Sequence, residues 1–364
     1  MAKLIFSMMS APEIFMQRCL ELALLGMGDV APNPMVGCVI VHDGIIIGEG
    51  YHEKCGLAHA EVNAIRSVLN PELLSQSTLY VSLEPCAHFG KTPPCSDLII
   101  ENRIPRVVIG TVDPFAQVAG KGINRMQNAG IKVEVGVLEK ECRELNRRFL
   151  TFHEKKRPYI ILKWAQTLDG FIDTDRSETD HPTWITNALA KRLVHKQRSE
   201  ESAILIGTNT AKYDNPALTV REWVGNQPIR MVIDRTGRLD KELHLFDGKA
   251  TTWTFTEQKK PDSENLKFIT LDFGKNMLPQ LLSELYKSDI LSVIVEGGGK
   301  LLNSFLELNL WDEAFVYTGN QFFGKGVSAP HISGETIAFE KLDDCKLHVL
   351  RNFSLVYTSN FREI

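Results

Sequence analysis

The sequence predicts two α/β domains that follow one another along the chain. Its 364 residues exceed the usual size of a single domain. In both halves, strand and helix patterns alternate, which is typical of a largely parallel sheet with helices packed on it. A short basic stretch that ends in a proline, Lys155–Pro158, follows a predicted helix. We place the boundary there and expect domains over residues 11–153 and 157–364.

The first half begins with an amphipathic helix over Glu13–Gly26, whose apolar residues fall on one face. The turn Asp43-Gly44 then joins two apolar runs, and this pattern predicts a hairpin that opens the sheet. The remaining elements alternate in type. Helices are predicted at 60–69, 98–102, 122–129 and 139–152, and strands at 78–83, 106–111 and 131–135.

The second half repeats the alternation without repeating the sequence of the first half. Strands are predicted at 159–164, 203–206, 229–233, 251–255 and 291–295, and helices at 189–198 and 278–286. This order again indicates an α/β domain.

Composition points to an ordinary enzyme of the cytoplasm. The formal net charge of −4 argues against a nucleic-acid binder, which would normally carry a basic face. Seven scattered cysteines do not form the even set of a secreted disulfide framework. No window approaches the ~20 apolar residues of a membrane span, and the short apolar start lacks a cleavage site. We therefore expect neither a nucleic-acid nor a membrane partner.

One group of residues in the first half has the composition of a metal site. His59-Ala60-Glu61 stands at a predicted helix start, and Pro85-Cys86 follows a predicted strand, with Cys95 nine residues later. One imidazole and two thiolates give zinc three ligands and leave a fourth position for water, whose pKa the metal lowers. Glu61 is suited to move protons to a departing amine, and a helix N-terminus would favour the Cys86 thiolate. The pattern is typical of zinc-dependent nucleobase deaminases.

Each part of this pattern has an ordinary explanation when it stands alone. A His-x-Glu pair occurs by chance in many helices, and single cysteines are often buried apolar residues. A structural zinc site would need a fourth protein ligand, which His88 could supply although it lies only two residues after Cys86. Glu61 distinguishes the two kinds of site, because structural zinc has no use for a carboxylate beside an open position.

The spacing of the cysteines narrows the prediction further. Eight residues separate Cys86 from Cys95, whereas the common deaminase pattern is Cys-x-x-Cys. The run from Glu84 to Cys95 and the segment 32–37 (Pro-Asn-Pro-Met-Val-Gly) resemble the bifunctional riboflavin-biosynthesis deaminase/reductase family, as do Asp113-Pro114 and Gly120-Lys121-Gly122. The resemblance implies a cytidine-deaminase-like three-layer α/β/α domain that acts on a phosphoribosylated diaminopyrimidine.

The same resemblance implies roles for single residues of the first half. His59, Cys86 and Cys95 would hold zinc, and Glu61 would be the proton shuttle. Asn33 would hydrogen-bond the pyrimidine or the ribose, although it could equally satisfy the backbone of its own turn. Weaker candidates for the substrate pocket, each also explicable as an ordinary loop residue, are His52, His88 and Lys91.

In the second half, glycines rather than a Rossmann motif predict a cofactor site. A Gly-x-Gly-x-x-Gly turn is absent from this half of the sequence. Instead an apolar strand leads into Gly297-Gly298-Gly299 and an amphipathic helix, where free N–H groups can hold a phosphate. Alone, such a triplet is as often a tight turn. Residues 158–170, 184–186 and 207–221, however, resemble the reductase half of the same family, which is dihydrofolate-reductase-like and uses NADPH.

The resemblance covers nearly the whole chain and implies two sets of residues in the second half. The set expected to contact NADPH is Ala165, Trp184, Thr210, Asp214, Gly298 and Gly299. The set expected to line the substrate site is Lys163, Arg198, Leu218, Arg221 and Glu296. Arg198 and Arg221 can grip a phosphate bidentately. Lys163, the expected catalytic residue, and Glu296 could polarise and protonate the opening ribose.

One departure from the family pattern leaves three hypotheses open. The family has Gly-(Asp/Glu)-Ser-x-Trp before the tryptophan, whereas Pro182 stands here in place of the serine, and residues 176–180 also differ. The first hypothesis is a bifunctional enzyme that deaminates a phosphorylated ribosylaminopyrimidine and then reduces its ribose to a ribityl chain. The others are a monofunctional deaminase with an inactive reductase-like half, and a non-enzymatic module with structural zinc. The resemblance also implies a homo-oligomer.

Overall fold

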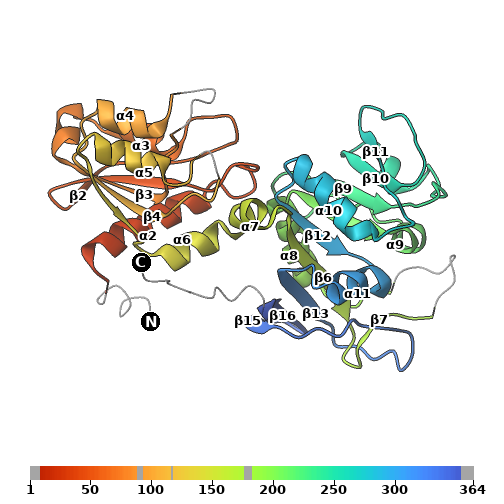
Figure 1. Ribbon diagram of the computed structural model, residues 1–364. Helices are drawn as coiled ribbons and strands as arrows, with labels where there is room; N and C mark the ends of the chain where they lie inside the picture. Colours follow the sequence, from red (N-terminus) through yellow and green to blue (C-terminus); the bar gives the residue numbers. More distant parts are fainter. Residues whose placement is uncertain (1–8, 88–92, 116–117, 176–182, 354–364) are drawn as a thin grey trace. The chain divides into compact units, whose positions relative to one another are not determined.

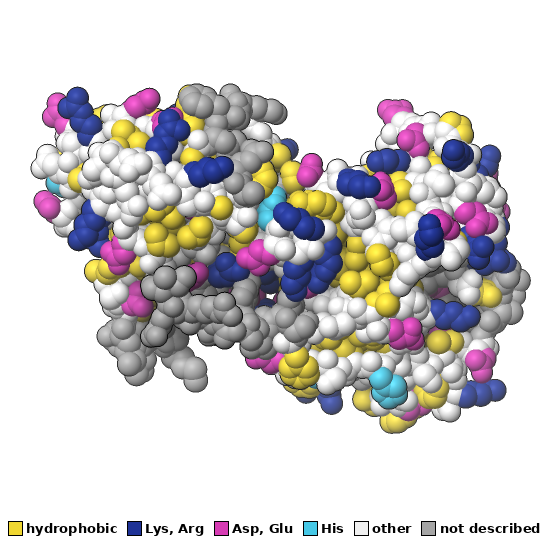
Figure 2. Space-filling model, in the orientation of Figure 1, with side chains coloured by type: hydrophobic (Ala, Val, Ile, Leu, Met, Phe, Trp, Pro, Cys, Tyr) yellow, Lys and Arg dark blue, Asp and Glu magenta, His cyan; other side chains and the backbone are white. Residues whose placement is uncertain are grey.

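The computed structural model describes residues 9–87, 93–115, 118–175 and 183–353 (Figure 1). The chain forms two compact units, Met1–Lys156 and Arg157–Ile364. Both are α/β, which confirms the predicted fold class. Acidic and basic side chains are interspersed on each unit over the face drawn in Figure 2. Among the helices of the described ranges, none is long and apolar enough to cross a membrane.

A five-stranded sheet is the middle layer of the first unit, in the order β2-β1-β3-β4-β5. β1 (Gly37–His42) pairs antiparallel with β2 (Ile45–Tyr51) and with β3 (Thr78–Leu83), and β4 (Arg106–Thr111) and β5 (Lys132–Val135) continue the sheet in parallel. The predicted hairpin at the edge of a parallel sheet is therefore confirmed. β1, β3 and β4 are buried almost throughout, as expected for strands covered on both faces.

Helices cover both faces of this sheet (Figure 1). α3 (Ala60–Ser67), α4 (Cys95–Glu101) and α5 (Lys121–Asn128) lie on one face, and α2 (Ala11–Leu24) and α6 (Glu139–Leu145) lie on the other. Because successive side chains of a strand point to opposite faces, each strand supplies both cores. The first core contains Cys38, Ile40, Leu79, Val81, Val107 and Ile109, and the second contains Val39, Val41, Tyr80 and Val108.

The prediction of one helix over 139–152 is wrong, because α6 ends at Leu145 and a separate helix, α7 (Arg147–Lys155), follows. Asn146 stands between the two helices and is buried. Its Oδ1 accepts the backbone N–H of Met35 at 2.9 Å, and its Nδ2 donates to the Met35 carbonyl at 2.8 Å. This contact spans 111 residues of sequence, so a local pattern cannot show it.

The second unit contains a nine-stranded sheet in the order β11-β10-β9-β8-β12-β6-β13-β16-β15. The strands from β11 to β13 are parallel, and β16 and β15 add an antiparallel edge. The bounds are β6 (Tyr159–Gln166), β8 (Ala203–Gly207), β9 (Ile229–Ile233), β10 (Thr252–Thr256), β11 (Leu266–Thr270), β12 (Ser292–Glu296), β13 (Glu313–Thr318), β15 (Glu335–Leu342) and β16 (Cys345–Arg351). A small separate sheet pairs β7 (Phe171–Asp173) with β14 (Val327–Ser328).

Within residues 157–175 and 183–353, two helices lie on each face of this larger sheet. α10 (Met277–Lys287) and α11 (Gly299–Glu307) pack against the main core, while α8 (Ala188–Glu200) and α9 (Thr208–Asp214) pack on the opposite face (Figure 1). The carboxyl ends of β6, β8 and β12 are adjacent in the sheet. In open α/β sheets this edge is where ligands bind.

Candidate active sites

The predicted zinc ligands of the first unit lie together. His59 is the N-cap residue of α3, Cys86 follows β3, and Cys95 begins α4. Their ligand atoms lie within 4.8 Å of one another. His59 Nδ1 is 3.7 Å from Cys86 Sγ and 3.3 Å from Cys95 Sγ. A convergent set of one nitrogen and two sulfur donors suits zinc, and with three ligands it leaves a coordination position open.

The electrostatics around Cys86 favour a thiolate. Interaction with the Cys95 thiol and with His59 lowers the pKa of Cys86, against the effect of burial. The backbone N–H of Cys95 also donates to Cys86 Sγ at 3.3 Å. The expected helix N-terminus stands at Cys95 rather than at Cys86, so the helix contributes to Cys86 through this one N–H group.

Glu61 lies in the first turn of α3, two residues beyond His59. The residue is only 3% exposed, and burial raises the pKa of Glu61 to about 7 although His59 opposes the shift. A carboxyl group with a pKa near neutrality can both accept and release a proton at working pH. This is the property that proton transfer between water and an amine requires.

Asn33 and His52 form a pair beside His59. Asn33 Nδ2 is 3.0 Å from His52 Nε2, and His52 Nδ1 is 3.0 Å from the carbonyl oxygen of Ala58. The rings of His52 and His59 meet edge-on, with centroids 5.4 Å apart. Asn33 is thus brought next to the predicted metal site, and its own turn is not what binds its amide group. The other two candidates for this pocket, His88 and Lys91, lie outside the described residues.

Glu84, a buried carboxylate two residues before Cys86, is a site residue that was not predicted from the sequence. Oε2 of Glu84 accepts the backbone N–H groups of Asp113 and Gly120, and Oε1 accepts those of Gly122 and Ile123, at 2.9–3.4 Å. A Cβ atom on Gly122 would lie 2.1 Å from the Pro85 carbonyl oxygen, so the start of α5 packs directly on the Pro85-Cys86 backbone. The only sequence signal for this contact was the pair Gly120 and Gly122 at the start of α5, whose backbone N–H groups can bind a carboxylate.

The second unit contains a cavity of about 1430 Å³ at the carboxyl ends of β6, β8 and β12. Every residue that the sequence analysis expects in the reductase site lines this cavity. They are Lys163, Ala165, Trp184, Arg198, Thr210, Asp214, Leu218, Arg221, Glu296, Gly298 and Gly299. Pro182 lies outside the described residues.

Charged side chains gather at the floor of the cavity. Lys163 and Glu296 are directly opposite each other on the paired strands β6 and β12, with Nζ 3.8 Å from Oε2. Arg198 reaches Glu296 from α8 with two contacts, Nη2 to Oε2 at 2.8 Å and Nε to Oε1 at 3.2 Å. Burial would raise the pKa of Glu296, but these two cations outweigh it and hold the pKa at about 2. Burial also lowers the pKa of Lys163.

The glycine triplet forms one wall of the cavity. Gly298 is the N-cap residue of α11, and its N–H donates to Thr210 Oγ1 at 2.9 Å. This hydrogen bond joins the glycine wall to the first turn of α9, and a Cβ on Gly298 would meet the same hydroxyl at 3.6 Å, an ordinary van der Waals distance. Trp184 lies at the cavity with 67% of its surface exposed, although Lys191 stacks on its ring. An open aromatic face and the N-terminus of a helix suit a dinucleotide such as NADPH.

Comparison with known proteins agrees with both halves of this description. Residues 158–352 match the family model of the RibD C-terminal domain, and residues 9–111 match the cytidine and deoxycytidylate deaminase zinc-binding region. The riboflavin biosynthesis protein RibD of Aquifex aeolicus is 41% identical over 320 residues, which cover 86% of this chain and 88% of that protein. The Escherichia coli protein of the same name is 39% identical over 330 residues, with 86% and 88% covered.

A solved structure from Thermotoga maritima covers more of the chain. It is a diaminohydroxyphosphoribosylaminopyrimidine deaminase/5-amino-6-(5-phosphoribosylamino)uracil reductase, 40% identical, with a TM-score of 0.85 over 94% of this chain and 99% of that one. Similarity at this level extends through both units and confirms the bifunctional hypothesis. The chain therefore belongs to the RibD family and is a riboflavin-biosynthesis enzyme with a zinc-dependent deaminase and an NADPH-dependent reductase.

Proposed function

We propose that the deaminase acts on 2,5-diamino-6-ribosylamino-4(3H)-pyrimidinone 5′-phosphate and that the reductase acts on its deaminated product. The observation that carries this proposal is the buried carboxylate of Glu61 beside three convergent zinc-type ligands. The name of the Thermotoga maritima relative, which pairs the same two activities, supports the choice of substrates.

We assign the deaminase to residues 11–153 and the reductase to residues 157–364. The division of the chain into compact units after Lys156 supports this assignment. The two family-model matches, which end at residue 111 and begin at residue 158, support it as well.

In the deaminase, His59, Cys86 and Cys95 would hold the zinc ion. Bound zinc supplies a Lewis acid that lowers the pKa of a water molecule toward neutrality. Glu61 accepts a proton from the attacking water and delivers it to the departing amine, so that a C–O bond replaces the C–N bond and ammonia leaves. Asn33, held beside His59 by its contact with His52, hydrogen-bonds the pyrimidine or the ribose.

In the reductase, Arg221 and Arg198 bind the anionic end of the substrate, with Leu218 packing against it. Arg198 also pairs with Glu296, so Arg221 is the residue of the two whose guanidinium has no carboxylate contact among the described residues. Lys163 holds the proton that the ring oxygen of the ribose takes when the C1′–O4′ bond breaks, and the ionised carboxylate of Glu296 holds the Lys163 ammonium in place. Their position on adjacent strands places both at the same point of the cavity floor.

Ala165, Trp184, Thr210, Asp214, Gly298 and Gly299 would contact NADPH, which supplies the hydride for C1′. Gly298 and Gly299 present the N-terminus of α11, where N–H groups attract a phosphate. Thr210 and Asp214 approach the same wall from α9.

We also propose that the enzyme works in the cytoplasm as a homo-oligomer. All seven cysteines, which lie within the described ranges, are free, as in a reducing compartment. The edge strand β15 exposes Ile337 and Phe339, and an exposed apolar edge favours pairing with another copy.

The substitution Glu61→Gln tests the deaminase assignment. Zinc content should stay at one ion per chain, whereas ammonia release should fall by about 10²–10⁴-fold, the usual contribution of a positioned general base. Glu72→Gln, an exposed carboxylate on the same unit, is the matched control and should leave both readings unchanged. Appreciable ammonia release by the Glu61→Gln enzyme would contradict the shuttle assignment.

A further inference from the structure

The segment Ala217–Arg221 carries two of the residues assigned to the reductase substrate site but belongs to no helix or strand. Leu218, within it, has a φ of +53°, a backbone region that branched and bulky residues rarely adopt. Neither local pattern nor a strand ladder therefore fixes the direction of Arg221. We therefore look for side chains outside the segment that bind its backbone.

Gln227 holds the segment at Val220. Its Oε1 accepts the Val220 N–H at 2.7 Å, and its Nε2 donates to the Val220 carbonyl at 3.0 Å. The side-chain amide thus pairs with both polar groups of one residue, as a neighbouring strand would. Val220 itself is buried, and the paired hydrogen bonds fix the position of its backbone.

His195 binds the backbone of the next residue, Arg221. The backbone N–H of Arg221 donates to His195 Nδ1 at 3.2 Å, and His195 lies on α8 with 2% of its surface exposed. The side chain of Arg221 then turns back to donate to Thr219 Oγ1 at 2.9 Å. Nδ1 can accept only while it carries no proton, and burial together with Arg198 and Arg221 lowers the pKa of His195 to about 4.

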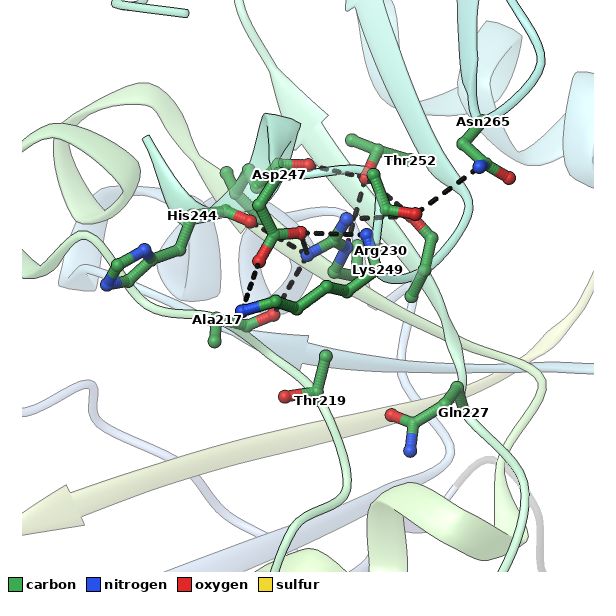
Figure 3. Close-up of polar contacts among 12 residues, drawn as sticks. Ala217, Thr219, Gln227, Arg230, His244, Asp247, Lys249, Thr252 and Asn265 are labelled. Carbon is green, nitrogen blue, oxygen red and sulfur yellow. Dashed lines mark hydrogen bonds and ion pairs between the residues drawn. The ribbon is translucent and has the colours of Figure 1, made fainter. Parts of the chain in front are cut away.

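Arg230 contacts the first residue of the segment, Ala217, but binds mainly to another part of the chain (Figure 3). This fully buried guanidinium donates to the carbonyl oxygens of His244, Ala250 and, at 3.4 Å, Ala217, and it pairs with Asp247. Most of its contacts join β9 to the loop before β10. Its loss would damage the fold itself, so Arg230 is not informative about the substrate.

We propose that His195 and Gln227 are positioning residues of the reductase, whose neutral side chains hold the Val220–Arg221 backbone and so direct Arg221 into the substrate cavity. The inference rests on the proposed function, in which Arg221 binds the anionic end of the substrate. It adds two residues that do not themselves touch the reacting atoms.

The side chains of His195 and Gln227 have the chemistry that this role requires. The segment needs hydrogen-bond acceptors close to Arg198 and Arg221, and a carboxylate there would pair with Arg221 and compete with an anionic substrate. A cationic holder would be repelled by both guanidinium groups. An imidazole nitrogen and an amide oxygen accept a hydrogen bond without adding charge, so Arg221 keeps its full charge for the ligand.

The test compares two substitutions of His195 in the full-length enzyme. Leu has a similar volume but no acceptor, whereas Asn can place Oδ1 where Nδ1 stands. For His195→Leu we expect KM for the deaminated pyrimidine phosphate to rise about tenfold, which corresponds to ~1.4 kcal/mol. His195→Asn should restore most of this loss. The kcat value and KM for NADPH should change little, because Lys163, Glu296 and the glycine wall are untouched. Gln227→Leu should behave as His195→Leu does.

A double substitution separates this inference from the proposed function. If His195 acts through Arg221, adding His195→Leu to Arg221→Met should raise KM by less than about twofold, because the effects of coupled residues do not add. A full tenfold effect in that background, or failure of His195→Asn to restore KM, would overturn the positioning role. An unchanged KM in Arg221→Met alone would instead refute the proposed role of Arg221, and the inference with it. NADPH binding and ammonia release verify that both units of each variant are folded.

Discussion

The two active sites of this enzyme are built in opposite ways. The deaminase site takes its key residues from 37 positions of sequence, between His59 and Cys95, and places them at two helix starts and one strand end. The reductase site draws on residues from Lys163 to Gly299, at the ends of several strands and helices. Metal coordination demands particular side chains at short range, whereas a large cofactor is held by many weak contacts.

The electrostatics of the sites differ as well. Near the metal ligands, burial keeps the pKa of Glu61 close to neutrality, so that this carboxyl group can exchange a proton. In the reductase, Arg198 and Lys163 keep Glu296 ionised, with a pKa of about 2. One carboxylate is poised to titrate, and the other is a fixed charge. Because each site takes its charged groups from its own compact unit, substitutions in one site should leave the chemistry of the other intact.

The largest effect is expected for Cys95→Ser. A serine hydroxyl is a poor zinc ligand, and His59 and Cys86 alone do not form a stable site. Zinc should be lost on dialysis and ammonia release should fall to background, while NADPH oxidation with the deaminated substrate persists. Cys55→Ser, at an exposed cysteine of the same unit, is the control. Retention of one zinc ion per chain by Cys95→Ser would remove this residue from the ligand set.

The substitution Glu296→Gln should damage only the reductase. It removes the charge that balances Lys163 and Arg198, and NADPH oxidation should fall by about 10²-fold, within the range for a group that assists proton transfer. Ammonia release should stay at the wild-type rate. Because Glu296 is ionised above about pH 2, the wild-type reductase rate should show no acid limb near pH 4–5 from this group. A fall in the wild-type rate near pH 4–5 that is absent from the Glu296→Gln enzyme would show that Glu296 titrates in this range and would contradict its role as a permanently ionised group.

A smaller effect is expected for Glu84→Gln, which perturbs the support of the metal site. The amide can replace only one of the two carboxylate oxygens, so two of the four bound N–H groups lose their acceptor. The free energy of unfolding of the first unit should fall by about 1–3 kcal/mol. Loss of ammonia release in increasing urea measures this, and Glu72→Gln again serves as the control. An unchanged midpoint would show that the Glu84 network contributes nothing to stability.

Much of the fold could be predicted because the buried strands are short, apolar and bounded by turns. The bounds predicted for residues 78–83 and 106–111 are those of β3 and β4, and both strands are buried along nearly their whole length. The same local clarity applies to His59, Glu61, Cys86 and Cys95, since a histidine, a carboxylate and two cysteines in this order are typical of a zinc deaminase site. The residues of the reductase cavity were found through the family resemblance rather than through a pattern.

What could not be predicted depends on contacts between distant residues. Asn146 interrupts a helical pattern because its side chain binds the Met35 backbone. The helix α9 has only seven residues and no apolar periodicity, and β15 is largely exposed, so neither gives a clear signal. Glu84, His195 and Gln227 act on backbone groups 7–39 residues away in sequence, and nothing in their immediate neighbours indicates this.

The most direct test of two independent active sites on one chain is NADPH oxidation by the Glu61→Gln enzyme. Supplied with the diamino substrate, this variant should oxidise almost no NADPH, because the first reaction is blocked. Supplied with the deaminated pyrimidine phosphate, it should oxidise NADPH at the wild-type rate. Failure of the Glu61→Gln enzyme to oxidise NADPH with the deaminated compound, while the wild type does so, would contradict the independence of the two sites, and failure by both enzymes would contradict the reductase activity itself.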